Sequence, residues 1–275
     1  MGNILEQLKS VDATPLFSCL SEAGPLSLRQ TEQYRFLEVD GFMQSVMDLQ
    51  QPTKACLPHA QVINLAQLAR PESILMAGLG GGDLLRQFAL PIGTKQFTCC
   101  EICPDIIEVY QVYFASHSPV DGLQLLQEDI NDFIPQCQRQ FDLIILDVFA
   151  GARQPECLQQ ESFFQECHSC LSDDGLLVVN VKVEQQSQLL QLALGLRRVF
   201  DKKILMVPVQ HCDNVIVFAF KGSPFAESNA DFVVQLDELN STLPSPVPLT
   251  LGELQACNVQ LEGGELELWH IKNNK

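Results

Sequence analysis

The chain of 275 residues has little positive charge: 17 lysines and arginines stand against 34 acidic residues, which gives a formal net charge of −17. Nucleic-acid phosphates need a basic surface, so this balance argues against a nucleic-acid partner. The chain also lacks any run of eighteen apolar residues, and residues 1–10 lack a cleavable signal pattern. We therefore expect a cytoplasmic protein with no membrane partner. The acidic surface suits cationic partners such as amines, although such surfaces more often serve solubility alone.

The sequence has no recognisable metal-ligand cluster, although it contains eleven cysteines and five histidines. Its two C-x-x-C pairs, Cys100/Cys103 and Cys167/Cys170, are more than sixty residues apart, which is too far for a compact zinc ribbon. The odd number of cysteines also argues against a complete disulfide framework. We expect buried reduced thiols and no metal.

The most informative segment reads E-S-I-L-M-A-G-L-G-G-G-D-L-L-R. An apolar run over residues 73–77 predicts a strand, and a helical pattern begins at Asp83. Glycines between the two allow the backbone to turn sharply and approach a ligand, and the helix directs free N–H groups at the same space. A second apolar run ends at Glu101, where a carboxylate can accept both hydroxyls of a ribose. The segment predicts a nucleoside-binding βαβ unit, and the residues of the loop expected to contact the cofactor are Gly78, Gly80, Gly81, Gly82 and Asp83.

The loop lacks the third glycine of a dinucleotide fingerprint. Counting from Gly78, the G-x-G-x-x-G pattern requires a glycine where the chain has Asp83. A carboxylate at this place repels a pyrophosphate, because like charges about 4 Å apart cost about 1 to 4 kcal/mol at partly exposed sites. The spacing therefore favours an adenosyl sulfonium over NAD.

Apolar runs alternate with helical patterns between residues 59 and 221, which is typical of an α/β fold. The expected strands are 73–77, 96–101, 123–127, 141–147, 176–181, 203–209 and 214–221. The expected helices are 59–69, 83–89, 104–115, 130–138, 160–171 and 185–200. The last two strands are separated only by a short turn, so they must pair as an antiparallel hairpin. A mostly parallel seven-stranded sheet with its last strand antiparallel is the Rossmann-like sandwich of methyltransferases.

The two ends of the chain have different patterns. Short alternating runs before residue 50, with Asp40–Gly41 as a tight turn, predict a small antiparallel sheet. After residue 222 the periodicity disappears, so we expect a surface extension. The predicted division is an N-terminal β domain at residues 1–55, a Rossmann-like domain that binds S-adenosylmethionine at 56–222, and a C-terminal extension at 223–275.

Several segments in order resemble signature segments of spermidine synthases and their relatives. They are D-G-F-M-Q at residues 40–44, the glycine loop, C-E-I-C-P-D-I-I-E-V-Y at 100–110, Q-E-D-I at 127–130 and F-D-L-I-I-L-D-V-F at 141–149. The resemblance implies that the co-substrate is S-adenosylmethionine or its decarboxylated form. It also implies cofactor contacts at Gln44 beside the sulfonium, Glu101 and Ile102 at the ribose, and Asp129 and Ile130 at the adenine.

The same resemblance implies a catalytic role for Asp147, as the aspartate that orients and deprotonates an attacking amine. From the residues alone, Asp147 follows an apolar strand at the carboxyl edge of the sheet, where a carboxylate can bind an incoming amine. It can equally be a structural carboxylate that caps a helix or loop.

The sequence departs from the spermidine synthase pattern at the groups that hold amines. Gly81 stands where the family has an aspartate for the amine of the donor, and Ala150 stands where it has a second aspartate after the catalytic one. Thr53, Lys54 and Ala55 replace a tyrosine, a histidine and a glutamate. A buried ammonium without an acceptor costs several kcal/mol, so ordinary spermidine synthesis is not expected.

Three functional hypotheses follow. If Gly81 leaves space for the methionine carboxylate of intact S-adenosylmethionine, methyl transfer to an unknown small-molecule acceptor is favoured. Asp83, two residues further on, can instead swing back toward an amine, which keeps aminopropyl transfer of polyamine biosynthesis as the alternative. The third hypothesis is a catalytically silent protein that binds nucleosides or serves as a scaffold. We expect a homodimer in each case.

Overall fold

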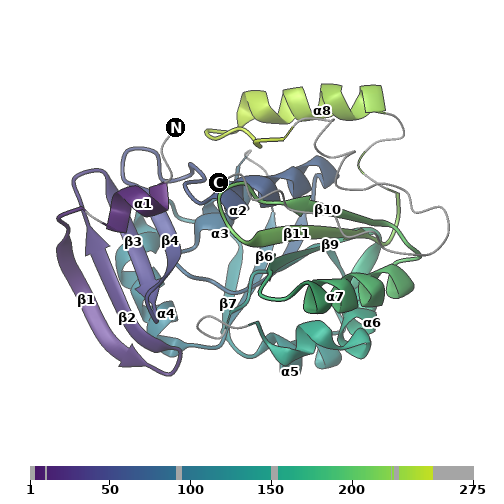
Figure 1. Cartoon of the computed structure of the whole chain (residues 1–275), viewed down its shortest axis with the longest axis horizontal. Helices are drawn as coiled ribbons and strands as arrows, with labels where there is room; N and C mark the ends of the chain where they lie inside the picture. The colour runs from purple at the N-terminus through teal and green to yellow at the C-terminus, as the bar shows by residue number, and fades with distance from the viewer. Residues whose placement is uncertain are drawn as a thin grey trace.

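The computed structural model describes residues 4–9, 11–90, 95–149, 154–223, 225 and 229–249. Two β-sheets organise this part of the chain: a four-stranded antiparallel sheet near the N-terminus and a seven-stranded sheet that follows it (Figure 1). The smaller sheet has the order β1-β2-β3-β4 and the larger one the order β10-β11-β9-β8-β5-β6-β7. This arrangement confirms the predicted α/β fold with a small N-terminal sheet.

The larger sheet has the predicted mixture of parallel and antiparallel strands. Its strands are β5 (Ser73–Ala77), β6 (Gln96–Glu101), β7 (Leu123–Gln127), β8 (Phe141–Leu146), β9 (Leu171–Lys182), β10 (Ile204–Pro208) and β11 (Asn214–Phe220). The first five form parallel pairs, whereas β11 runs antiparallel to both β9 and β10. The hairpin expected from the short turn before residue 214 is therefore confirmed.

Helices cover both faces of this sheet, as its nearly continuous apolar strands predict. The helices are α2 (Pro58–Ile63), α3 (Asp83–Phe88), α4 (Pro104–Val109), α5 (Ile130–Gln136), α6 (Glu161–Ser169) and α7 (Gln186–Val199). Residues of α2, α3 and α4 share one apolar core with Ile74 and Met76 of β5. Residues of α5, α6 and α7 share the other core with Leu75 and Ala77. The alternation along β5 thus divides the interior into two layers.

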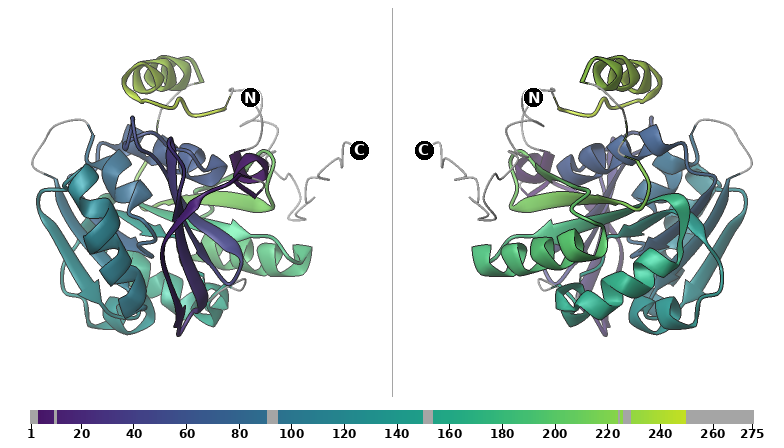
Figure 2. Two further views of the ribbon diagram at one scale, coloured as in Figure 1. Left: turned by 90° about the vertical axis from the view of Figure 1, so that its left-hand side faces the viewer. Right: turned by 90° about the vertical axis from the view of Figure 1, so that its right-hand side faces the viewer.

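The ends of the chain contain two elements that the sequence analysis did not predict. The N-terminal sheet has β2 (Gly24–Gln30), β3 (Tyr34–Val39) and β4 (Phe42–Asp48), as expected, and also an edge strand β1 (Thr14–Ser21), preceded by the short helix α1 (Ile4–Lys9). The region expected to be an aperiodic extension contains the helix α8 (Asn229–Thr242). This helix lies against the segment that follows α2, at the top of Figures 1 and 2. Phe232 and Leu236 are spaced one turn apart and anchor it in the core.

Two predicted helices change their winding before they end. The helix expected at residues 59–69 is α-helical only in α2 and continues as a 3₁₀ segment over Asn64–Ala69. The helix expected at 104–115 continues from α4 as a π-helical segment over Tyr110–Phe114. Apolar periodicity places a helix but does not distinguish these windings, because the tertiary contacts of the last turns select them.

A single carboxylate joins the N-terminal sheet to the larger sheet. Asp83, the first residue of α3, accepts hydrogen bonds from Ser45 Oγ at 2.7 Å and from the backbone N–H of Val46 at 3.1 Å, both in β4. It also pairs with the guanidinium of Arg86, which is almost fully buried and donates to the carbonyl of Gly81. The charged pair therefore fixes β4 beside the start of α3.

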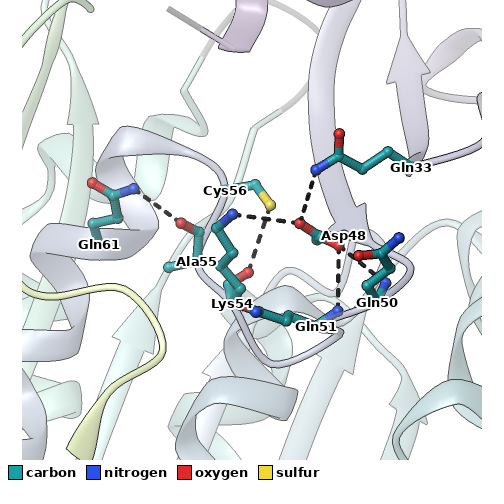
Figure 3. A network of polar contacts seen from close by, with 8 residues as sticks. All are labelled: Gln33, Asp48, Gln50, Gln51, Lys54, Ala55, Cys56 and Gln61. Atoms are coloured by element: carbon teal, nitrogen blue, oxygen red, sulfur yellow. Dashed lines mark hydrogen bonds and ion pairs between the residues drawn. The ribbon is translucent and has the colours of Figure 1, made fainter. Parts of the chain in front are cut away.

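The loop after β4 is held by a second carboxylate, Asp48 (Figure 3). Its oxygens accept hydrogen bonds from the backbone N–H groups of Gln50 and Gln51 and from the Gln33 side chain, and Lys54 pairs with it at 3.4 Å. Burial raises the pKa of the Asp48 carboxyl, but these donors outweigh burial and hold the pKa below its ordinary value. Lys54, one of the departures from the spermidine synthase pattern, is thus engaged in shaping this loop.

Replacement of Asp83 by alanine should destabilise the fold strongly. The substitution leaves the Arg86 guanidinium buried without its partner, and breaking a buried pair costs about 3 to 5 kcal/mol. Urea unfolding at constant pH measures the change. The matched control Ser45→Ala removes one hydrogen bond to the same carboxylate and should cost only about 1 kcal/mol. Equal losses in the two variants would contradict the role assigned to the Asp83–Arg86 pair.

Candidate functional site

A cavity of about 570 Å³ opens at the carboxyl ends of β5, β6, β8 and β9 and extends to β4. Parallel strands of an open sheet bind ligands at this edge, where the strand order changes direction. Most of the residues predicted to bind the cofactor line this cavity: Gln44, Gly78, Gly80, Gly81, Asp83, Glu101, Ile102, Asp129 and Ile130. Asp147 lines it as well. The structure thus brings together residues that are up to about one hundred positions apart in the sequence.

The glycine loop between β5 and α3 is enclosed by protein on the side away from the cavity. Gly78, Gly80 and Gly82 have positive φ angles of +89°, +51° and +73°, which favour glycine. A Cβ on Gly78 would overlap the backbone carbonyl of Asp147, and one on Gly82 would overlap the ring of Tyr110. The sequence analysis assigned these glycines to ligand approach. The structure adds that close packing of the loop also excludes a side chain at these positions.

At Gly81 the direction that a side chain would take is filled, although Gly81 itself lines the cavity, and the hypothesis of a ligand carboxylate beside the loop stays a prediction. A Cβ at Gly81 would overlap Ser45 Oγ and would lie 2.9 Å from the ring of Phe114. The space that an aspartate would use in this direction is therefore filled. The physical reason lies in the π-helical segment after α4, which brings Phe114 and Tyr110 against the loop, together with the approach of β4.

Asp83 does not have the freedom that the sequence analysis gave it. It lines the cavity, but hydrogen bonds from Ser45 and Val46 and the ion pair with Arg86 hold its carboxylate in place. Swinging toward an amine would break all three contacts. Its role as a cofactor contact stays a prediction.

Glu101, the last residue of β6, is held where a ribose ligand is expected. Its carboxylate accepts hydrogen bonds from the backbone N–H of Leu79 in the glycine loop at 3.0 Å and from that of Cys103 at 2.9 Å. The residue is 7% exposed. Burial raises the pKa of the Glu101 carboxyl above its ordinary value, although the backbone donors act in the opposite direction. The carboxylate is thus oriented before any ligand arrives.

The residues predicted at the adenine lie at the start of α5. Asp129 is the N-cap of this helix, and its Oδ1 accepts a hydrogen bond from the backbone N–H of Asn131 at 2.9 Å. Ile130 beside it is buried, whereas Ile102 is 59% exposed, and both line the cavity together with Asp129. Apolar side chains and a carboxylate in one cavity suit a flat base with an amino group.

Asp147 lies directly after β8 and is oriented by a relay of two asparagines. Asn180 Nδ2 in β9 donates to Asp147 Oδ1 at 2.8 Å, and Asn214 Nδ2 in β11 donates to Asn180 Oδ1 at 2.8 Å. All three residues line the cavity, and Asn180 is fully buried. The Asp147 carboxylate thus contacts a side chain of the neighbouring strand β9. The alternative considered from the sequence was a carboxylate that caps a helix or a loop, which is a different contact.

Asn180 and Asn214 were not singled out from the sequence. A single asparagine in an apolar strand carries little signal, but a buried polar residue within the run L-L-V-V-N-V is the kind of anomaly that can be searched for. The segment Leu57–Ala60 was also missed: these residues line the cavity. The departures noted at Thr53–Ala55 lie just before them.

The ten cysteines in the described part of the chain are free thiols, of which six are buried and four are partly exposed. Cys100 lines the cavity, but burial raises its pKa to about 12, so it is a neutral thiol at ordinary pH. Cys100 and Cys103 belong to different core layers. Among the described residues, no three histidine, cysteine or acidic side chains gather as a metal site. The same part of the chain contains no helix long and apolar enough to cross a membrane.

Comparison with known proteins bears directly on this site. The family model of the spermine/spermidine synthase domain matches residues 56–222. The chain belongs to the spermine/spermidine synthase family. This family match covers β5 to β11, and it confirms the resemblance seen in the sequence motifs.

Two similar proteins are both named polyamine aminopropyltransferase. The polyamine aminopropyltransferase of Neisseria meningitidis serogroup B is 26% identical over 221 residues, which cover 78% of this chain and 83% of the relative. The polyamine aminopropyltransferase of Chromobacterium violaceum is 26% identical over 224 residues, covering 80% and 85%. These similarities favour aminopropyl transfer, the alternative of the sequence analysis, over methyl transfer, its first choice.

Solved structures support the fold. A probable spermidine synthase from Corynebacterium glutamicum has a TM-score of 0.69 at 20% identity, with 87% of this chain and 90% of that chain covered. Human methyltransferase-like protein 13 in complex with SAH has a TM-score of 0.58 at 22% identity, with 70% and 91% covered. Both share the sheet described above, which agrees with the predicted methyltransferase-like architecture.

Replacement of Gly81 by alanine should destabilise the spermine/spermidine synthase domain by about 1 to 3 kcal/mol, because the added methyl group overpacks the space beside Phe114. Chemical denaturation measures the change. The control is Gly195→Ala in α7, where the new Cβ would lie 3.7 Å from Phe164, an ordinary contact. Removing a glycine from a helix there should stabilise by about 0.5 to 1 kcal/mol. A neutral Gly81→Ala variant would show that the loop has room.

The affinity for an adenosyl nucleoside should depend on the ionisation of Glu101. The carboxylate form accepts the ribose hydroxyls, and its pKa is raised, so affinity should be complete at higher pH. It should fall as the pH is lowered through a value above that of an ordinary glutamate. Stability of the ligand-free protein has the opposite sign: the contribution of Glu101 is complete at low pH and is lost as the pH rises through its raised pKa. Calorimetric titration with methylthioadenosine across pH measures the first effect.

The matched variant for this titration is Glu101→Gln. It should bind the nucleoside more weakly by about 1 to 3 kcal/mol and should lose the pH dependence assigned to residue 101. An unchanged affinity, or a pH profile identical to that of the native chain, would place the ribose elsewhere.

Proposed function

We propose that this chain is an aminopropyltransferase that moves the aminopropyl group of decarboxylated S-adenosylmethionine to an amine acceptor. The observation that carries the proposal is the charge of the cavity. Six carboxylate residues line it: Glu22, Asp83, Glu101, Glu128, Asp129 and Asp147. Among the described lining residues, Lys182 is the only lysine or arginine.

This charge distribution distinguishes the two donors. Intact S-adenosylmethionine carries a carboxylate, which an acidic cavity repels, whereas the decarboxylated form carries only a sulfonium and an ammonium. Opposite charges about 4 Å apart attract by about 4 kcal/mol at an effective dielectric constant near 20. The filled side-chain direction at Gly81 weakens the argument that favoured a ligand carboxylate beside the loop. The names of the curated relatives support the same donor.

The geometry of Asp147 supports direct attack by an amine. In the proposed step, the lone pair of the acceptor nitrogen forms a bond to the carbon next to the sulfonium, and the carbon–sulfur bond breaks. Its electron pair stays on sulfur, so methylthioadenosine leaves as a neutral molecule. The nitrogen loses a proton to Asp147, whose orientation is set by Asn180. The contribution of the chain is alignment of the nitrogen and carbon, together with acceptance of this proton.

Thermal shifts should rank the donors. Decarboxylated S-adenosylmethionine should stabilise the chain more than the intact form at equal concentration, and a ligand at 100 times its Kd adds about 2.7 kcal/mol. Incubation with a panel of amines should yield an aminopropylated product by mass spectrometry. Asp147→Asn should bind the donor normally but lower the transfer rate by a factor of about 10² to 10⁴.

Other outcomes identify the alternatives. A larger shift with intact S-adenosylmethionine, together with a product heavier than the acceptor by about 14 Da, the mass of one added CH₂ group, would restore the methyltransferase hypothesis. Donor binding without any transfer would favour the catalytically silent hypothesis.

A further inference from the structure

Lys182 lines the cavity at a position where its charge can affect which acceptor binds. It is the last residue of β9, two positions after Asn180, so both side chains lie on the same face of the strand. Asn180 is directed at Asp147. Lys182 Nζ lies 4.4 Å from the ring centroid of Phe42, the first residue of β4, and both residues line the cavity. The ammonium therefore lies in the same cavity as Asp147, two strand positions after the asparagine that contacts this carboxylate.

The charge of Lys182 has no carboxylate partner. No ion pair within 4 Å involves Lys182 in the part of the chain that the structure describes, and its recorded contact is with the face of the Phe42 ring. The other basic side chains near the loop behave differently: Arg86 pairs with Asp83 and Lys54 pairs with Asp48. Lys182 thus presents a positive charge that is available to an anionic group.

Lys182 also lines a second cavity. It has a volume of about 370 Å³ and shares Lys182 and Pro155 with the main cavity. Three amide side chains, Gln154, Gln159 and Gln188, line it together with Glu184. Glu184 is exposed, whereas Lys182 is half-buried at the junction. An acceptor whose amine reaches Asp147 while its other end extends into the second cavity must pass the Lys182 ammonium.

We infer that the acceptor is an amine that carries an anionic group at its other end, such as an aminocarboxylate, and that Lys182 binds this group. The inference rests on the proposed transfer to an amine and names its substrate class. A protonated diamine places its second ammonium near Lys182, where like charges repel, whereas a carboxylate in the same place is attracted. Asn180, which contacts Asp147, and Lys182 are two positions apart in β9 and so are separated by roughly 7 Å along the strand, a span that a short acceptor chain can bridge.

Two compounds of equal chain length test this inference: butane-1,4-diamine and 4-aminobutanoate. Each is titrated into the full chain saturated with methylthioadenosine, and the dissociation constants are compared by calorimetry. The native chain should bind the aminocarboxylate at least about tenfold more tightly than the diamine. Lys182→Glu should reverse the order, and Lys182→Gln should bring the two affinities together.

The control variant is Lys203→Glu, which makes the same change in net charge. Lys203 is exposed just before β10, beside the end of β11 opposite to Asn214. This variant should keep the preference of the native chain. Because Lys182→Gln removes the charge without introducing a new one, it keeps the test valid if the glutamate variant fails to fold.

Binding and turnover separate the two proposals. A preference for the diamine in the native chain, an affinity ratio that Lys182→Glu and Lys182→Gln leave unchanged, or binding of neither compound would overturn the role of Lys182. Transfer rates with decarboxylated S-adenosylmethionine test the proposed function independently. Transfer to the diamine alone would preserve the proposed function and refute the role of Lys182. Binding of the aminocarboxylate without transfer would preserve the role of Lys182 and refute the proposed function.

Discussion

Close packing around the glycine loop is the constraint on which the site depends. At Gly78, Gly81 and Gly82 the backbone passes so near to the Asp147 carbonyl, Ser45, Phe114 and Tyr110 that a Cβ has no place. This contact sets the distance between β5 and the strand ends beside it. It also fixes the loop N–H of Leu79 on Glu101. Glu101 and Asp147, the carboxylates proposed for the ribose and for catalysis, are thus positioned by the same few residues.

The small N-terminal sheet completes the site. Through Ser45 and Val46, β4 binds Asp83, and the preceding residues Phe42 and Gln44 line the cavity. The Asp83–Arg86 pair therefore has a structural effect on the ligand side, since a shift of β4 would move these residues. A carboxylate that would oppose a pyrophosphate is used here to join two sheets. The aspartate that stands in place of the third glycine of a dinucleotide fingerprint therefore also has a structural role, which is to bind β4 and Arg86.

The proposed acceptor end of the cavity differs in charge from the proposed donor end. Six carboxylate residues line the main cavity, whereas Lys182 lies where the proposed acceptor would extend. A site that binds a diamine would need a carboxylate to accept hydrogen bonds from each of its two ammonium groups. The sequence already indicates that such groups are missing, at Ala150 and at Thr53–Ala55, although Ala150 lies outside the described residues. Within the ranges that the structure describes, Lys182 is a cation with no carboxylate partner within 4 Å, at the end proposed for the acceptor.

The sequence by itself determined the strands of the larger sheet, its terminal hairpin and the positions of Glu101 and Asp147, because apolar periodicity and strand ends are local properties. It did not reveal β1, α8 or the π-helical segment, whose stability comes from packing against distant residues. Only the tertiary structure decided that Gly81 faces Ser45 and Phe114 and that Lys182 shares a cavity with Asp147, since these contacts join residues far apart in the chain. Side-chain neighbours across a sheet edge are set by topology, and one sequence does not contain them explicitly.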